Sequence, residues 1–102
     1  MRVITATSAD TNYAVDERLL ALNANERIHC SSVVLQADPA NTADILVGDV
    51  SLSATNWGWR LSPGDITTID AGSGANTVNL NSLYFRGEGA ASQKLSVGQI
   101  IS

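Results

Sequence analysis

The chain has 102 residues, of which 44% are hydrophobic and 16% are charged, and its formal net charge is −4. This size allows one domain with one modest core, and the composition is too apolar for a disordered tail. The six basic residues are scattered along the sequence, so the chain lacks the basic stripe that displaces counterions from phosphates, and we expect no nucleic-acid partner.

The sequence also argues against a disulfide, a signal peptide and a membrane role. Cys30 is the only cysteine, which excludes a disulfide within the chain. The N-terminal residues lack the continuous apolar segment of a secretory signal. No apolar run approaches the roughly 20 residues that are needed to cross a bilayer. We therefore expect no membrane partner.

The N-terminal segment 2–10 is rich in β-branched side chains. It suits a strand at the edge of a sheet, or an extended arm that adds to the sheet of a neighbouring chain by main-chain pairing. We therefore divide the chain into an N-terminal strand or arm, residues 1–12, and a β-sandwich domain, residues 13–102. Four residues of the segment are candidate interface residues: Arg2, Val3, Ile4 and Thr5.

Segment 16–22 is the one place where a helix competes with a strand. Asp16 could cap a helix, but Asn23 and Asn25 follow at once. So short a segment is marginal as an isolated helix. We interpret it as a strand or a single helical turn.

Alternation of apolar and polar residues with a period of two predicts strands along the rest of the chain. The predicted strands include residues 27–35, 77–80, 83–86 and 94–97. In the last two, Leu83 and Phe85 should share one face, and Leu95 and Val97 should point inward. Two glycine-rich segments have the composition of loops, 72–76 and 87–92.

Two polar turns flank a short strand predicted at residues 45–49. Pro39 has a fixed φ that suits a turn at 38–41, and the Pro63-Gly64 pair adds a residue that tolerates a positive φ at 62–65. Strands at intervals of roughly 8 to 12 residues with turns between them indicate an all-β fold. We predict a single-domain antiparallel β-sandwich of jelly-roll type.

Trp57 and Trp59 would share one face if residues 57–61 are extended, with Arg60 exposed on the other face. Two interpretations remain open. Either both rings close one end of the core, or they form a contact patch for another chain or a glycan, because tryptophan is enriched at interfaces. We take Trp57, Trp59 and Arg60 as candidate interface residues beside the N-terminal segment.

The only histidine, His29, excludes a metal site with several histidines in one chain. We interpret it as a half-exposed strand residue next to a buried Cys30 thiol. Asp38, Asp44 and Asp49 do not have the spacing of a calcium loop and are expected to be solvated turn residues.

The remaining candidate for chemistry is the glycine loop at 87–92. It follows no βαβ pattern and carries Glu88 where a phosphate would have to approach, so we interpret it as a hairpin loop. The sequence also contains no G-x-S-x-G nucleophile motif. We therefore expect no enzymatic activity, no cofactor and no metal ion.

Four short segments resemble, in order and spacing, small virion structural proteins of tailed bacteriophages, of the head decoration or cement type. They are residues 38–41, 45–49, 61–65 and 83–87. The resemblance covers roughly residues 33–97. It departs at residues 56–59, where the pattern has asparagine followed directly by glycine and a smaller apolar residue.

This resemblance implies a β-sandwich on the outer face of an assembled capsid, commonly a trimer, that clamps neighbouring capsomers and has no enzymatic residues. The implied partners are the major capsid protein and further copies of the chain, and the implied location is the virion surface after synthesis in the host cytoplasm. Two alternatives stay open: a tail- or fibre-associated structural protein, and a glycan-binding β-sandwich module that stacks sugars on Trp57 and Trp59.

Overall fold

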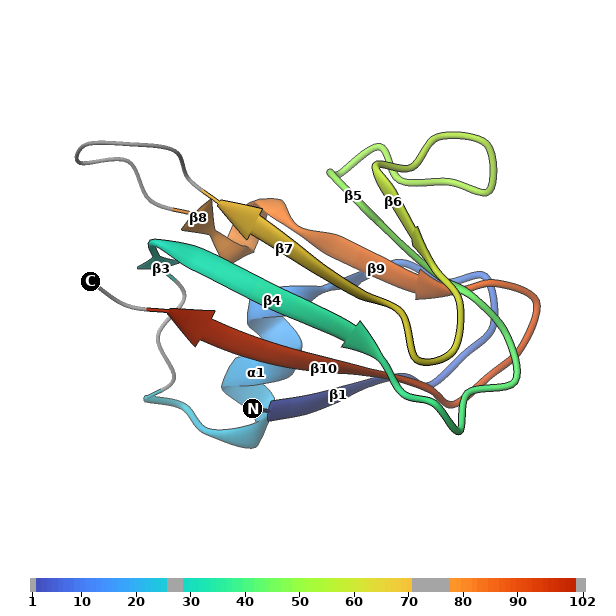
Figure 1. The fold of residues 1–102 in the computed structure, drawn as a ribbon, viewed down its shortest axis with the longest axis horizontal. Coiled ribbons are helices and arrows are strands. Elements are labelled where there is room, and N and C mark those ends of the chain that lie inside the picture. The colour runs from blue at the N-terminus through green and yellow to red at the C-terminus, as the bar shows by residue number, and fades with distance from the viewer. Residues whose placement is uncertain (1, 26–28, 71–77, 101–102) are drawn as a thin grey trace.

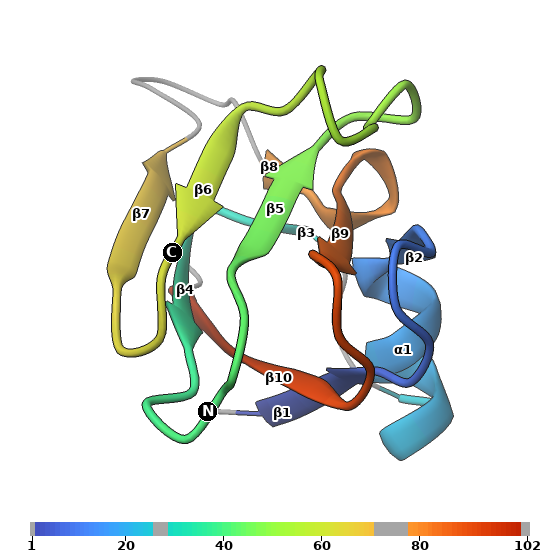
Figure 2. The same cartoon turned by 90° about the vertical axis from the view of Figure 1, so that its right-hand side faces the viewer.

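The computed structural model describes residues 2–25, 29–70 and 78–100, which fold into antiparallel β-sheets and one short α-helix (Figure 1). One four-stranded sheet, here the β10 sheet, has the order β1 (Arg2–Ala6), β10 (Gln93–Ile100), β4 (Ser32–Ala37), β7 (Ile66–Asp70). A second four-stranded sheet, the β5 sheet, has the order β2 (Tyr13–Ala14), β9 (Tyr84–Gly87), β5 (Ile45–Gly48), β6 (Trp59–Leu61). Figure 2 shows β5 and β6 on the opposite side of the molecule from β1 and β10.

The predicted alternation is confirmed in the two strands nearest the C-terminus. Leu83 and Phe85 are buried, and Leu95 and Val97 of β10 point into the core while Ser96 between them is half-buried. Alternation places successive side chains on opposite faces of a sheet, so each strand has an apolar inner face.

The core combines both four-stranded sheets and the helix. Its members include Val33, Leu35, Leu95 and Val97 from the β10 sheet, Ile45, Val47, Leu61 and Phe85 from the β5 sheet, and Val15 and Leu19 from the helix. One contiguous core therefore supports the whole described chain.

The prediction for segment 16–22 is wrong, because the chain forms an eight-residue helix, α1 (Val15–Leu22). Asp16 is not its N-cap, since Ala14 takes that position without a side-chain bond. Val15 and Leu19, four residues apart on one face, are fully buried in the core. Tertiary packing of this apolar face stabilises a helix that would be marginal alone.

The single long strand predicted at 27–35 is also wrong, because the chain changes partners at Ser31. β3 (His29–Cys30) pairs with β8 (Val78–Asn79), whereas β4 pairs with β10 and β7. Residues 27, 28 and 77, and the predicted loop at 72–76, lie outside the described residues. Leu80, predicted to continue the strand at 77–80, is buried at the start of a 3₁₀ turn, η1 (Leu80–Ser82).

Both predicted proline turns are confirmed. The Asn41 amide donates to the Asp38 carbonyl over 2.9 Å, and the Asp65 amide donates to the Ser62 carbonyl over 2.8 Å. Gly64 has a φ of +89°, the left-handed conformation that favours glycine.

The turn at 62–65 is also bonded to the last residue of β4, directly before the turn at 38–41. The Gly64 amide donates to the Ala37 carbonyl over 2.9 Å, and the Ala37 amide donates to the Asp65 carbonyl over 3.0 Å. These bonds hold the turn at 62–65 against the end of β4.

Candidate functional site

A recess of about 360 Å³ opens where β5 ends and β6 and β9 begin. Its walls come from two connections of the β5 sheet, the one between β5 and β6 and the one that leads into β9, and they mix aromatic rings with short polar side chains. The main lining residues are Asp49, Asn56, Trp57, Trp59, Ser82 and Leu83.

The connection from β5 to β6, loop 49–58, folds back over the outer face of the β5 sheet. Leu52 is buried, and a Cβ atom placed on Gly48 would lie 3.2 Å from the Leu52 Cδ1 atom. Leu46, which points to this outer face between Arg86 and Arg60, is completely buried although it does not belong to the core cluster. The loop thus covers an apolar side chain that the core does not reach.

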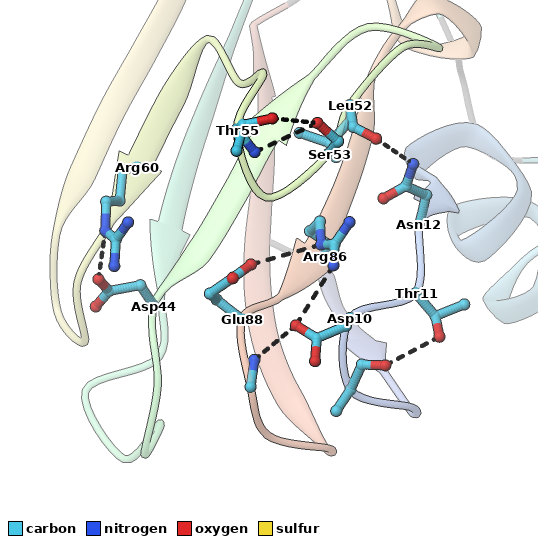
Figure 3. Close-up of polar contacts among 12 residues, drawn as sticks. Asp10, Thr11, Asn12, Asp44, Leu52, Ser53, Thr55, Arg60, Arg86 and Glu88 are labelled. Carbon is cyan, nitrogen blue, oxygen red and sulfur yellow. Dashed lines mark hydrogen bonds and ion pairs between the residues drawn. The ribbon is translucent and has the colours of Figure 1, made fainter.

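A contact with the N-terminal part of the chain anchors this loop. The Asn12 Nδ2 atom donates to the Leu52 carbonyl over 2.7 Å, and Figure 3 shows the two residues facing each other. At the other end of the loop, the Gly58 amide donates to the Val47 carbonyl over 2.8 Å. These bonds hold both halves of the loop against the sheet.

Three polar side chains form a network inside the loop. Asp49 Oδ1 accepts hydrogen bonds from the Ser51 amide over 2.9 Å and from its hydroxyl, and Asn56 Nδ2 donates to Ser51 Oγ over 2.9 Å. Hydrogen bonds from Ser51 favour the charged carboxylate and lower the pKa of Asp49 below its ordinary value. Asp49 therefore stays ionised beside the recess at neutral pH.

The structure separates the two tryptophans, so neither sequence interpretation fits both rings. Trp59 lies opposite Val47 in β6 and packs against the core. Trp57 precedes the strand, and its side chain is 42% exposed. Val50 in the same loop is 76% exposed. Of the two tryptophans that line the recess, Trp59 is therefore the one packed against the core, and Trp57 is the one accessible to solvent.

Arg60 is exposed on the outer face, as predicted, and it has a partner there. Its Nε atom lies 2.7 Å from Asp44 Oδ2, and its side chain is 48% exposed (Figure 3). An exposed ion pair of this kind contributes little to stability. Arg60 is not among the residues that line the recess.

A second arginine on this face, Arg86, is not among the interface residues predicted from the sequence. Its side chain is only 11% exposed. Its Nη2 atom lies 3.4 Å from Asp10 Oδ1, and its Nε atom lies 3.5 Å from Glu88 Oε2 (Figure 3). The Gly89 amide also donates to Asp10 over 2.9 Å. Arg86 thereby joins the segment after β1 to the loop after β9, which is a structural role.

The N-terminal candidates lie elsewhere on the molecule. β1 is the outer strand of the β10 sheet, with Val3 exposed and Ile4 buried. Figures 1 and 2 both place β1 in the lower part of the view and loop 49–58 at the top. The predicted interface residues therefore divide between two surfaces on opposite sides of the molecule.

Sequence reasoning missed several residues of the recess, among them Asn56, Ser82 and Leu83. A signal for the loop was present, because Asp49 and Ser51, and Ser53 and Thr55, have the two-residue spacing of local side-chain turns. That spacing could have predicted a compact loop. The contribution of Ser82 depends on β9 lying beside β5, which no local pattern encodes.

The residues considered for chemistry are dispersed. His29 is exposed and Cys30 is buried on the opposite face, where burial raises the pKa of the thiol. Asp38 accepts a bond from the Ala40 amide within its own turn. Within residues 2–25, 29–70 and 78–100, no three histidine, cysteine, aspartate or glutamate side chains are close enough to hold a metal ion.

In comparison with known proteins, no family model matches the chain, and no curated protein or solved structure matches it. In the part of the chain that the structure describes, no helix is long and apolar enough to span a membrane.

Proposed function

We propose that this protein is a bacteriophage head decoration protein, a non-enzymatic binding domain that attaches to the outer surface of the assembled capsid and bridges its subunits. Its partners are the major capsid protein and further copies of the chain, as a trimer, and its location is the virion surface. A ligand that binds only the assembled shell shifts the equilibrium toward that shell by mass action.

The observation that carries this proposal is the exposed aromatic recess. Trp57 and Val50 are the most accessible apolar side chains of loop 49–58, and Trp59, loop hydrogen bonds and Leu52 hold that loop in place. A rigid exposed tryptophan is the kind of residue that dominates binding energy at protein interfaces. We assign capsid contact to this surface.

We also infer that the two four-stranded sheets pack face to face as a jelly-roll sandwich. Support comes from the core, which takes side chains from both sheets. Numbered by their position among the eight strands of these sheets, one sheet reads 1-8-3-6 and the other 2-7-4-5. This matches a roll of two Greek keys, a fold found in viral capsid and lectin domains. As a fold-level analogy it favours a binding role.

The test is co-sedimentation with intact heads of the phage that encodes the chain. The wild-type protein should sediment with heads, and Trp57→Ala should lose most of this binding while keeping its circular dichroism spectrum and its melting temperature. Leu20→Ala is the matched control, because Leu20 is 36% exposed, close to the 42% of Trp57, and lies in α1, away from the recess. Failure of the wild-type protein to bind heads would refute the proposal, and binding to tails instead would support the tail-associated alternative.

A glycan-binding module is the second candidate, and one observation favours it. The accessible Trp57 ring stands beside the polar side chains of Asp49, Asn56 and Ser82 in a recess large enough for a sugar ring. An aromatic face with a few polar groups is the usual composition of a small-molecule site. Titration with mono- and disaccharides, followed by tryptophan fluorescence, separates the two candidates, because a decoration protein should show no saturable change.

A further inference from the structure

The β10 sheet ends in two strands, β1 and β7, that each have a single strand neighbour among the described residues. An edge strand presents unpaired backbone groups to any strand that approaches it. Each edge also exposes one apolar side chain on the outer face, Val3 with 46% of its surface accessible and Ile66 with 61%. Both edges therefore combine a strand that has one strand neighbour with an exposed apolar residue.

These two apolar residues lie in the same row of the sheet. Val3 is opposite Ser96, Ser96 is opposite Gln36, and Gln36 is opposite Ile66. Ser96 and Gln36 between them are half-buried on the outer face. The row thus begins and ends with an exposed apolar side chain and is polar in its middle.

Strand direction allows the row to continue into another copy. Each neighbouring pair in the sheet is antiparallel, so β1 and β7 of one chain run in opposite directions. When two copies stand side by side in the same orientation, β1 of one meets β7 of the next as an antiparallel pair. With the row kept in line, Val3 of one copy lies beside Ile66 of the other, which buries both apolar side chains.

Charge also favours this pairing over the pairing of like edges. Arg2 begins β1, and Lys94 lies opposite Thr5, whereas Asp65 precedes β7 and Asp70 is its last residue. Two β1 edges would bring basic groups together, and two β7 edges would bring acidic groups together. Like charges across a strand pair are destabilising, and opposite charges are favourable.

A groove of about 150 Å³ runs beside β1, between this strand and the second half of α1. Val3, Ala21 and Leu22 line it, and Leu22 is exposed. This groove has room for an apolar side chain of an added strand, so it fits the Ile66 side chain of a second copy.

We propose that β1 of one copy pairs with β7 of another, antiparallel and head to tail, so that the β10 sheet continues from copy to copy. The inference rests on the self-association that is part of the proposed function. It is tested with the chain alone, so its failure and a failure to bind capsids are separate results. A head-to-tail contact of this kind closes into a ring when the rotation between copies allows it.

The experiment mixes two variants that each carry one added cysteine, Val3→Cys and Ile66→Cys, under mild oxidation and reads the mass on a non-reducing gel. A disulfide requires Cα atoms within about 7 Å. The two added cysteines are on different chains, so every bond between them joins two chains. The mixture should form a species of twice the chain mass that neither variant forms alone.

Three controls accompany the mixture. Val50→Cys, highly exposed on the opposite side, reports chance collisions and should not cross-link to Val3→Cys. Thr68→Cys lies on the same face as Ile66 but two residues along β7, so it should cross-link less. The wild-type chain shows whether the buried Cys30 forms disulfides under the same oxidation, and it should form none. Circular dichroism verifies that each variant is folded.

Three results would overturn the proposal: no doubled species in the mixture at concentrations where the wild-type protein is oligomeric, links formed only by Val3→Cys alone or Ile66→Cys alone, or equal yield with Val50→Cys. A monomeric mass for the wild-type protein at all concentrations would overturn it as well.

Discussion

On the outer face of the β5 sheet, Leu46 is completely buried beneath loop 49–58, whereas on the outer face of the β10 sheet Val34 is only half-buried. The β5 sheet has its own loop as a cover, and the surface left for contact is the recess at the end of that loop. The β10 sheet has an open, mostly polar outer face with apolar residues at its edges. One chain therefore presents two different kinds of surface, an aromatic recess and a pair of open strand edges.

The largest expected effect compares one aliphatic side chain from each outer face. Leu46→Ala should lower the free energy of unfolding by about 2–5 kcal/mol, because it leaves a cavity under the loop. Val34→Ala should cost about 1 kcal/mol, because less apolar surface returns to water. Urea denaturation of both variants measures the difference. Equal losses would show that loop 49–58 does not shield Leu46 in solution.

A smaller effect compares the two arginines of the covered face. Arg86→Ala removes the ion partner of the Asp10 and Glu88 carboxylates, and its expected cost is about 1–3 kcal/mol because the shielded Glu88 Oε2 atom loses its nearby counter-charge. Arg60→Ala removes an exposed ion pair with Asp44, which should cost about 0–1 kcal/mol. Denaturation at low and high salt tests this, and the Arg60 contribution should be the more sensitive to salt.

The smallest expected effect is the response of loop 49–58 to acid. The hydrogen bonds from Ser51 lower the pKa of Asp49 from an ordinary 3.8, so they stabilise the loop above that pH and are lost as the pH falls through the lowered pKa. Emission of the exposed Trp57 should therefore change in strong acid before the protein unfolds. Asp49→Asn should abolish this early change, and an unaltered transition in that variant would contradict the role given to Asp49.

Local sequence patterns predicted the parts of the fold that depend on neighbouring residues. The turn at 62–65 followed from Pro63-Gly64, because a fixed φ and a tolerated positive φ belong to that turn wherever it occurs. The inward faces of residues 83–86 and 94–97 followed from alternation, because the side-chain period of a strand is two. The exposure of Arg60 followed from the same rule.

The candidate site was predicted only in part, since its residues meet through contacts distant in sequence. Trp57 and Trp59 were recognised, but their separation into an accessible ring and a core-packed ring depends on where loop 49–58 leaves the sheet. Ser82 reaches the recess because β9 pairs with β5. Neither result follows from local spacing.

By itself, the sequence determined an antiparallel β-rich domain with polar turns, because period, proline and glycine act over a few residues. Tertiary structure decided the rest. It made a helix of residues 15–22 by burying Val15 and Leu19, it divided the predicted strand at Ser31 between two sheets, and it aligned Val3 with Ile66 across four strands. Each of these outcomes depends on which strands become neighbours, and that choice is made by the packing of the whole core.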